Sequence, residues 1–144
     1  ITDGASALVL ISESEGRSRG LKPLARIVDY AEAGVDPKIM GIGPVPAIQK
    51  LLSKTRMKLD DFGLIELNEA FAAQVIACTR ELPMNPDALN VNGGAIALGH
   101  PIGCTGARIV TTLVHEMQKR KTQYGLATLC ISGGMGIALA VERL

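Results

Sequence analysis

Hydrophobic and polar positions along the chain follow two periods, which predicts strands interleaved with helices. Short apolar runs rich in β-branched residues predict strands at residues 5–12, 24–33, 62–67, 126–131 and 136–141. Helices are predicted from Pro44 or Pro46 to Leu52, at 68–82 and at 104–121, and either a short helix or a linker at 14–20. A short strand-like segment is predicted at 89–91. This order favours an α/β domain with a mixed, mostly buried sheet, helices packed on it, and a closing antiparallel strand pair.

Two of the predicted helices have well-defined apolar faces. These faces consist of Ile109, Val110, Leu113, Val114 and Met117 in the one, and of Phe71, Val75, Cys78 and Leu82 in the other. Lys119, Arg120 and Lys121 suit the C-terminal end of the helix dipole. The helix at 104–121 is therefore the most strongly predicted element.

The stretch from Tyr124 to Val141 carries no charged residue and is just long enough to raise the question of a membrane span. The segment 132–136 contains three glycines and interrupts it in the middle. We therefore expect two short buried strands around a turn, and no membrane association.

Composition narrows the class of protein. A chain of 144 residues that is 47% hydrophobic can bury a core, which excludes a disordered tail. With 15 Lys+Arg against 14 Asp+Glu and 3% aromatic residues, it has neither the charge nor the stacking side chains for nucleic acid.

The cysteines, histidines and first residues bear on the cellular compartment, on metal binding and on whether the chain is part of a longer one. The three cysteines include no CxxC pair, so we expect a reducing, cytoplasmic location and no disulfide framework. His100 and His115 are the only histidines, and we expect no metal site. Residues 1–4 show no methionine and no leader pattern, so the sequence is interpreted as a piece of a longer chain.

The first candidate segment is Asn68-Glu69-Ala70-Phe71, which follows a predicted strand and opens a predicted helix. The pattern alone favours Asn68 as an N-cap and Glu69 as a partner of the helix dipole. The alternative is an amide that orients a water molecule or a substrate oxygen.

The second candidate is the glycine-rich loop 93–103. Gly94 and Gly99 have phosphate-loop spacing, but His100-Pro101 stands where lysine and a hydroxyl residue are required, which excludes a nucleoside triphosphatase. His100 lies just before a helix, whose N-terminus keeps the imidazole neutral and able to exchange a proton. A loop histidine hydrogen-bonded for structure is an equally good interpretation, whereas His115 is expected to be a solvated or packing residue.

The third candidate is Cys130, which ends a strand beside a glycine-rich turn. The backbone N–H groups of the turn Ser132-Gly133-Gly134 could stabilise an oxyanion. A single cysteine is more often a small core residue, and that interpretation is applied to Cys78 and Cys104.

In combination, these segments resemble a known family. Asn68-Glu69-Ala70-Phe71, Gly99-His100-Pro101 and Cys130-x-x-Gly133-x-x-Gly136 are similar to the three C-terminal motifs of the thiolases, which include acetyl-CoA acetyltransferases and 3-ketoacyl-CoA thiolases. The segments 90–103, 35–37 and 40–44 also resemble thiolase sequence, so the likeness covers essentially the whole chain. Residues 1–20 resemble the end of the family's N-terminal half, and 21–144 its C-terminal domain.

The resemblance implies an enzyme that carries out Claisen condensation of two acetyl-CoA molecules, or the reverse thiolysis of a 3-ketoacyl-CoA. It implies that Cys130 is the acid/base thiol, that His100 activates the nucleophilic cysteine and holds the enolate oxygen, and that Asn68 positions a water molecule. Phe71 and Met40 match residues that line the acyl and pantetheine pocket. Coenzyme A is then a substrate or product, and no other cofactor is expected.

Two departures from the family pattern matter. Ser132 replaces a glycine that usually follows two residues after the cysteine, and it would be strained if that position required a positive φ. The nucleophilic cysteine and the loop that binds the CoA adenylate belong to the family's N-terminal half, which the resemblance does not find here. We therefore expect a truncated domain that is inactive alone and that is part of a homo-oligomer when joined to that half.

Two rival interpretations remain. A non-catalytic, thiolase-like module that binds acyl groups or lipids would keep the pocket without the chemistry; the trio Asn68, His100 and Cys130 argues against it and Ser132 slightly for it. A relative of the β-ketoacyl synthases would carry a second histidine in place of Cys130.

Overall fold

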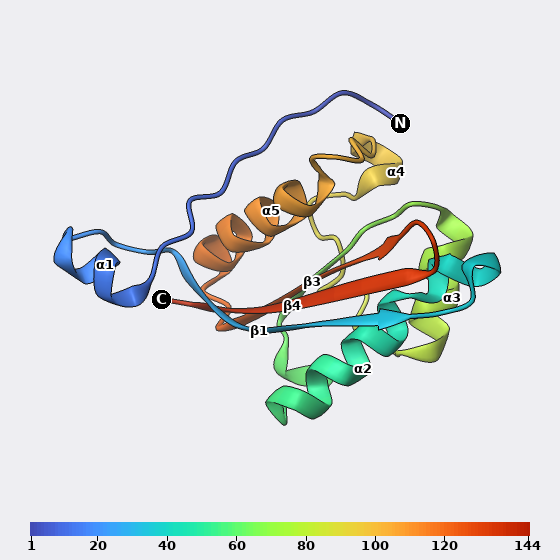
Figure 1. Ribbon diagram of the computed structural model, residues 1–144, viewed down its shortest axis with the longest axis horizontal. Helices are drawn as coiled ribbons and strands as arrows, with labels where there is room; N and C mark the ends of the chain where they lie inside the picture. The colour runs from blue at the N-terminus through green and yellow to red at the C-terminus, as the bar shows by residue number, and fades with distance from the viewer.

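The computed structural model describes residues 1–144 as three layers, with helices on both faces of one sheet (Figure 1). The sheet has four strands in the order β1-β4-β3-β2. Helix α5 (Thr105–Arg120) covers one face, and α2 (Pro44–Thr55) with α3 (Ala72–Glu81) covers the other. The predicted α/β class and mixed sheet are confirmed.

The strands pair in both directions. β1 (Ala25–Gly34) and β4 (Met135–Arg143) are antiparallel, as are β4 and β3 (Tyr124–Ile131), whereas β3 is parallel to β2 (Leu64–Leu67). The predicted closing pair is therefore the β3–β4 hairpin, and it accounts for the long uncharged stretch. None of the helices combines the length and the apolar composition that crossing a membrane requires.

Each face of the sheet has its own apolar core. Between the sheet and α5, Ile109, Leu113 and Met117 pack on Leu64 and Val141. The larger core lies between the sheet and α2 and α3, and includes Ile48, Leu51, Cys78, Leu82 and Leu126. The apolar stripe predicted for 104–121 is confirmed in α5. That of 68–82 is confirmed for Cys78 and Leu82 but not for Phe71, which is exposed.

The remaining elements are short. They are α1 (Glu13–Ser18), α4 (Ala95–Leu98) and the 3₁₀ helices η1 (Pro37–Ile42) and η2 (Leu59–Asp61). Two prolines, at 44 and 46, lie in the first turn of α2, which extends one turn beyond the predicted end.

Three predicted elements differ in the structure. Residues 5–12 form no strand, although they are apolar: Val9 is 91% exposed, and the segment runs beside α5 with Ser6 Oγ 3.1 Å from Thr111 Oγ1 (Figure 1). An extended run becomes a strand only when a neighbouring strand supplies its hydrogen bonds. The four strands of the sheet pair with one another, and none of them pairs with residues 5–12. The segment 89–91 makes a single bridge, Leu89 with Ile65, and α3 begins at Ala72 rather than at residue 68.

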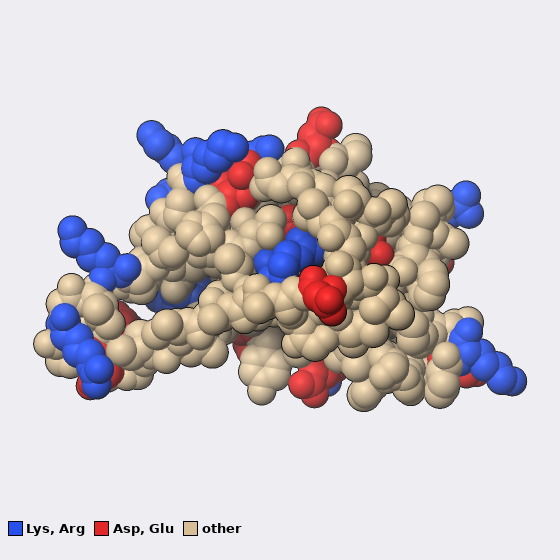
Figure 2. Space-filling view, turned by 90° about the horizontal axis from the view of Figure 1, so that it is seen from above, with Lys and Arg blue, Asp and Glu red and all other residues tan.

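Charged side chains are spread in small groups over the face in Figure 2, and uncharged residues cover most of it. The charged side chains form several ion pairs, including that of Lys54 with Asp29 at 2.6 Å. This distribution agrees with the near-zero net charge of +1.

Candidate active site

Asn68 and His100 are brought into direct contact by the end of β2 and the glycine-rich loop. The Asn68 N–H donates to the Thr128 carbonyl at 2.9 Å, so the chain stays on the β3 ladder one residue beyond β2. The N-cap of α3 is Phe71, which makes no side-chain cap bond. The interpretation of Asn68 as an N-cap is therefore wrong. Its side-chain Nδ2 instead lies 3.4 Å from His100 Nε2, and its Oδ1 is buried without a partner.

The His100 ring is held from its other side by Thr105. The His100 Nδ1 atom lies 2.7 Å from the Thr105 Oγ1 atom at the start of α5. Burial lowers the pKa of His100 below its ordinary 6.5, and the Arg108 guanidinium lowers it further. The imidazole is therefore neutral at pH 7 and can accept a proton.

The glycine loop is anchored by Glu69 and Asn90. The Glu69 carboxylate accepts from the Ile96 N–H at 2.9 Å and from Asn90 Nδ2 at 3.0 Å. Asn90 also hydrogen-bonds both the N–H and the carbonyl of Leu67, each at 2.9 Å. Glu69 thus serves α4 and the loop rather than the dipole of α3, which corrects the sequence interpretation. These bonds hold the segment that carries His100 against the end of β2.

Cys130 reaches the same edge of the sheet from the neighbouring strand. Leu67 pairs with Thr128 in the parallel register, so Asn68 and Cys130 both lie at the carboxyl ends of β2 and β3. By strand alternation Cys130 points to the face covered by α2 and α3, where its charge would raise the pKa of Cys78. The thiol is buried and forms no hydrogen bond with Asn68 or His100. Burial raises the pKa of Cys130 above its ordinary 9.0, so the group is a thiol at rest.

The turn after Cys130 packs closely on the segment that carries Met40. Positive φ angles occur at Gly133 and Gly134 (84° and 88°) and not at Ser132, which is exposed and unstrained. A Cβ atom on Gly134 would overlap the Val35 carbonyl, because the turn lies against the end of β1. Met40 is half-buried in η1, which packs on α3 and β3.

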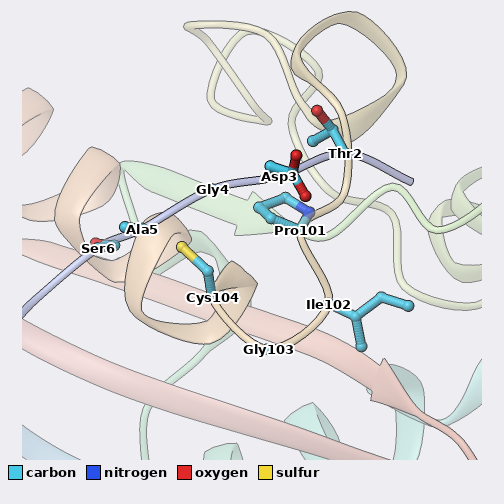
Figure 3. Close-up of a pocket in the computed structure, with 9 residues that line it drawn as sticks. All are labelled: Thr2, Asp3, Gly4, Ala5, Ser6, Pro101, Ile102, Gly103 and Cys104. Atoms are coloured by element: carbon cyan, nitrogen blue, oxygen red, sulfur yellow. The ribbon is translucent and has the colours of Figure 1, made fainter.

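Phe71 and Cys104 differ from the other candidates in their exposure. The Phe71 ring is 64% exposed at the start of α3. Cys104 is half-exposed instead of lying in the core as expected, whereas Cys78 is buried and His115 exposed, as predicted. A cavity of about 350 Å³ lies between residues 2–6 and 101–104, and Cys104 is one of its lining residues (Figure 3). It is a groove beside the histidine loop and does not include Asn68, His100 or Cys130.

Sequence reasoning missed three polar residues behind the site: Thr105 and Glu66, which are buried, and Arg108, which is partly buried. Glu66 lies on β2 with its carboxylate 3.5 Å from Arg108 Nη1, and burial raises its pKa to about 7. By strand alternation Glu66 shares the α5 face with Leu64, but β2 is otherwise apolar and buried throughout, so no local pattern marks that face. No three His, Cys, Asp or Glu side chains are grouped so that they could hold a metal ion.

Comparisons with known proteins agree with these motifs. The family model "Thiolase, C-terminal domain" matches residues 21–143. An acetyl-CoA acetyltransferase of Paracoccus denitrificans is 57% identical over 99% of this chain and 37% of the relative, and one of Escherichia coli is 58% identical over 100% and 36%. The chain therefore spans little more than a third of the length of these relatives.

Solved structures give the same picture. The acetyl-CoA acetyltransferase of Bacillus anthracis superposes with a TM-score of 0.92 at 55% identity, covering 93% of this chain and 34% of that one. Human mitochondrial 3-ketoacyl-CoA thiolase in complex with CoA superposes with a TM-score of 0.90 at 49% identity, covering 92% and 34%. The chain belongs to the thiolase family, of which it contains the C-terminal domain.

Proposed function

We propose that this chain supplies the proton-transfer half of the active site of an acyl-CoA acyltransferase. The reaction is condensation of two acetyl-CoA molecules to acetoacetyl-CoA, or the reverse thiolysis of a 3-ketoacyl-CoA. The observation that carries the proposal is the 3.4 Å contact between Asn68 and a neutral, hydrogen-bonded His100. Relatives named acetyl-CoA acetyltransferase and a thiolase solved with CoA support the substrate class.

The roles follow from the chemistry of each group. The neutral His100 imidazole takes a proton from the nucleophilic thiol and then donates a hydrogen bond to the enolate oxygen. Asn68, whose Oδ1 has no protein partner, orients a water molecule at the same oxygen. Cys130 exchanges the α-proton of the second acyl-CoA, and as a thiol at rest it is set to donate a proton in thiolysis.

Substrate binding is assigned to residues around the β3–β4 turn. Ser132 and Gly133 are both exposed residues, and their backbone N–H groups are assigned to a thioester oxygen. Phe71 and Met40 would line the acyl and pantetheine pocket. The large exposed area of Phe71 is consistent with a wall that another part of the protein completes.

The proposal requires an N-terminal half that carries the nucleophilic cysteine. The relatives are nearly three times as long as the matched segment, which supports this partner. We propose residues 1–20 as the tail of that half, a homo-oligomeric assembly of the full-length protein, a cytoplasmic location, and no cofactor beyond CoA itself.

The test compares the chain alone with a fusion in which residues 1–144 replace the matching segment of the Escherichia coli relative. The chain alone should not cleave acetoacetyl-CoA, whereas the fusion should. In the fusion, Cys130→Ala, His100→Ala or Asn68→Ala should each lower kcat by about 10²-fold or more, the size of a general acid–base contribution. Cys104→Ala, at the neighbouring groove, is the matched control and should change little.

Two results would contradict the proposal. Turnover by the chain alone that Cys130→Ala abolishes would show that no second half is needed. A folded fusion that binds acetyl-CoA but neither forms an acyl-enzyme nor turns over would favour the non-catalytic binding module.

A further inference from the structure

The Thr105 hydroxyl is fully buried and touches two polar atoms of the histidine loop. Its Oγ1 lies 2.7 Å from His100 Nδ1 and 2.9 Å from the Pro101 carbonyl oxygen. The side chain is therefore confined between a ring nitrogen, which can donate or accept, and a carbonyl, which can only accept.

The direction of these bonds selects one tautomer of the ring. The hydroxyl has a single proton and donates it to the Pro101 carbonyl, so the Thr105 oxygen accepts from His100 Nδ1–H. The Nε2 atom then carries the lone pair. It faces Asn68 Nδ2, an amide donor 3.4 Å away, so all three contacts agree. The opposite tautomer would place Nε2–H against the amide N–H groups and leave the carbonyl without the hydroxyl proton.

We propose that Thr105 is a positioning residue that holds neutral His100 as the Nδ1–H tautomer, so that Nε2 is free to receive a proton in the reaction proposed above. When a thiol transfers its proton to Nε2, the thiol becomes a thiolate and the ring an imidazolium. The Nδ1–H bond to Thr105 needs no rearrangement, because the hydroxyl already donates to Pro101. The charged guanidinium of Arg108 also acts on the ring and favours its neutral form.

The tautomer can be measured on this chain without any activity. Long-range ¹H–¹⁵N correlation of ¹⁵N-histidine-labelled chain at about pH 8, where imidazole is neutral, distinguishes the protonated ring nitrogen. We expect His100 to carry its proton on Nδ1 in the parent and in Thr105→Ser, and to lose that preference in Thr105→Val. His115, which is exposed on α5, is the internal control and should give the same pattern in all three.

Kinetics of the fusion provide the second readout. Thr105→Val should lower kcat by about 10- to 100-fold with KM changed less than about twofold. This is part of the rate enhancement of about 10²–10⁴-fold that a general base contributes. Thr105→Ser should restore kcat. Thr111→Val, one and a half turns further along α5, is the matched control and should leave kcat unchanged.

The outcomes separate this inference from the proposed function. An Nε2–H tautomer in the parent chain, or retention of Nδ1–H by a folded Thr105→Val chain, would overturn the role of Thr105 whether or not the fusion is active. An inactive parent fusion would overturn the proposed function and leave the tautomer result standing. If Thr105→Val does not fold, the tautomer of the parent and the behaviour of Thr105→Ser still decide.

Discussion

Replacing Glu66 with glutamine is expected to change how the stability of the chain depends on pH. The Glu66 side chain is 4% exposed between β2 and α5, and its ion pair with Arg108 is long at 3.5 Å. Burial raises its pKa from 4.5 to about 7; Arg108 opposes this rise, and the charges of Glu69 and Glu116 add to it.

The sign and size of the effect follow from the two pKa values. Between pH 4.5 and about 7 the folded chain holds a proton on Glu66 that the unfolded chain has lost, so the free energy of unfolding falls as pH rises. The stabilising contribution is complete below the unfolded pKa and lost above the folded one. A difference of about 2.5 units at 1.36 kcal/mol per unit corresponds to about 3 kcal/mol.

The measurement is urea unfolding of the parent and Glu66→Gln, followed by circular dichroism from about pH 4.5 to about pH 8. Below about pH 7 the Glu66 of the folded parent is itself protonated, so glutamine removes a charged partner of Arg108 only above that pH. Relative to the parent, the variant should gain about 3 kcal/mol across this range, which is a shift of about 1–2 M in urea midpoint.

A matched control is Glu81→Gln at the exposed end of α3, which should follow the parent at every pH. Parallel stability curves for the parent and Glu66→Gln would refute the reasoning, because they would mean that Glu66 ionises alike in the folded and unfolded chains.

Two further predictions concern the turn after Cys130 and the second buried carboxylate. Gly134→Ala should destabilise the chain by about 1–3 kcal/mol in urea unfolding, since a side chain there must adopt φ 88° and displace the Val35 carbonyl. Gly103→Ala, which meets open space, should be nearly neutral. For Glu116, hydrogen bonds from Asn92 and Arg120 lower the pKa, so its stabilising effect is present above about pH 4.5 and lost in acid. Glu116→Gln should therefore have a lower free energy of unfolding at neutral pH, and that free energy should fall less on acidification than in the parent. Urea unfolding that shows the same fall in acid for both chains would contradict this.

Features that depend on residues within one element were predicted correctly from the sequence, whereas features that depend on contacts with distant segments were not. The period of α5 and the hairpin that begins at Tyr124 were predictable, because the spacing of apolar residues within one element indicates which of its sides is buried. Residues 5–12 have the same kind of local pattern but form no strand, because pairing depends on a partner elsewhere in the chain. Asn68 likewise has the appearance of an N-cap, and only the β2–β3 ladder shows that α3 begins later.

The sequence by itself determined the α/β class, the main helices and the three thiolase-like motifs, since these depend on residue types at fixed spacing. Tertiary structure alone decided that Asn68 contacts His100 and that Glu69 anchors the glycine-rich loop. It also placed Thr105 against His100 Nδ1, where it determines which ring nitrogen carries the proton. The physical reason is that hydrogen bonds between distant segments depend on where strands and loops meet in space. The tautomer of a histidine is thus set by its neighbours in the fold rather than by its neighbours in the chain.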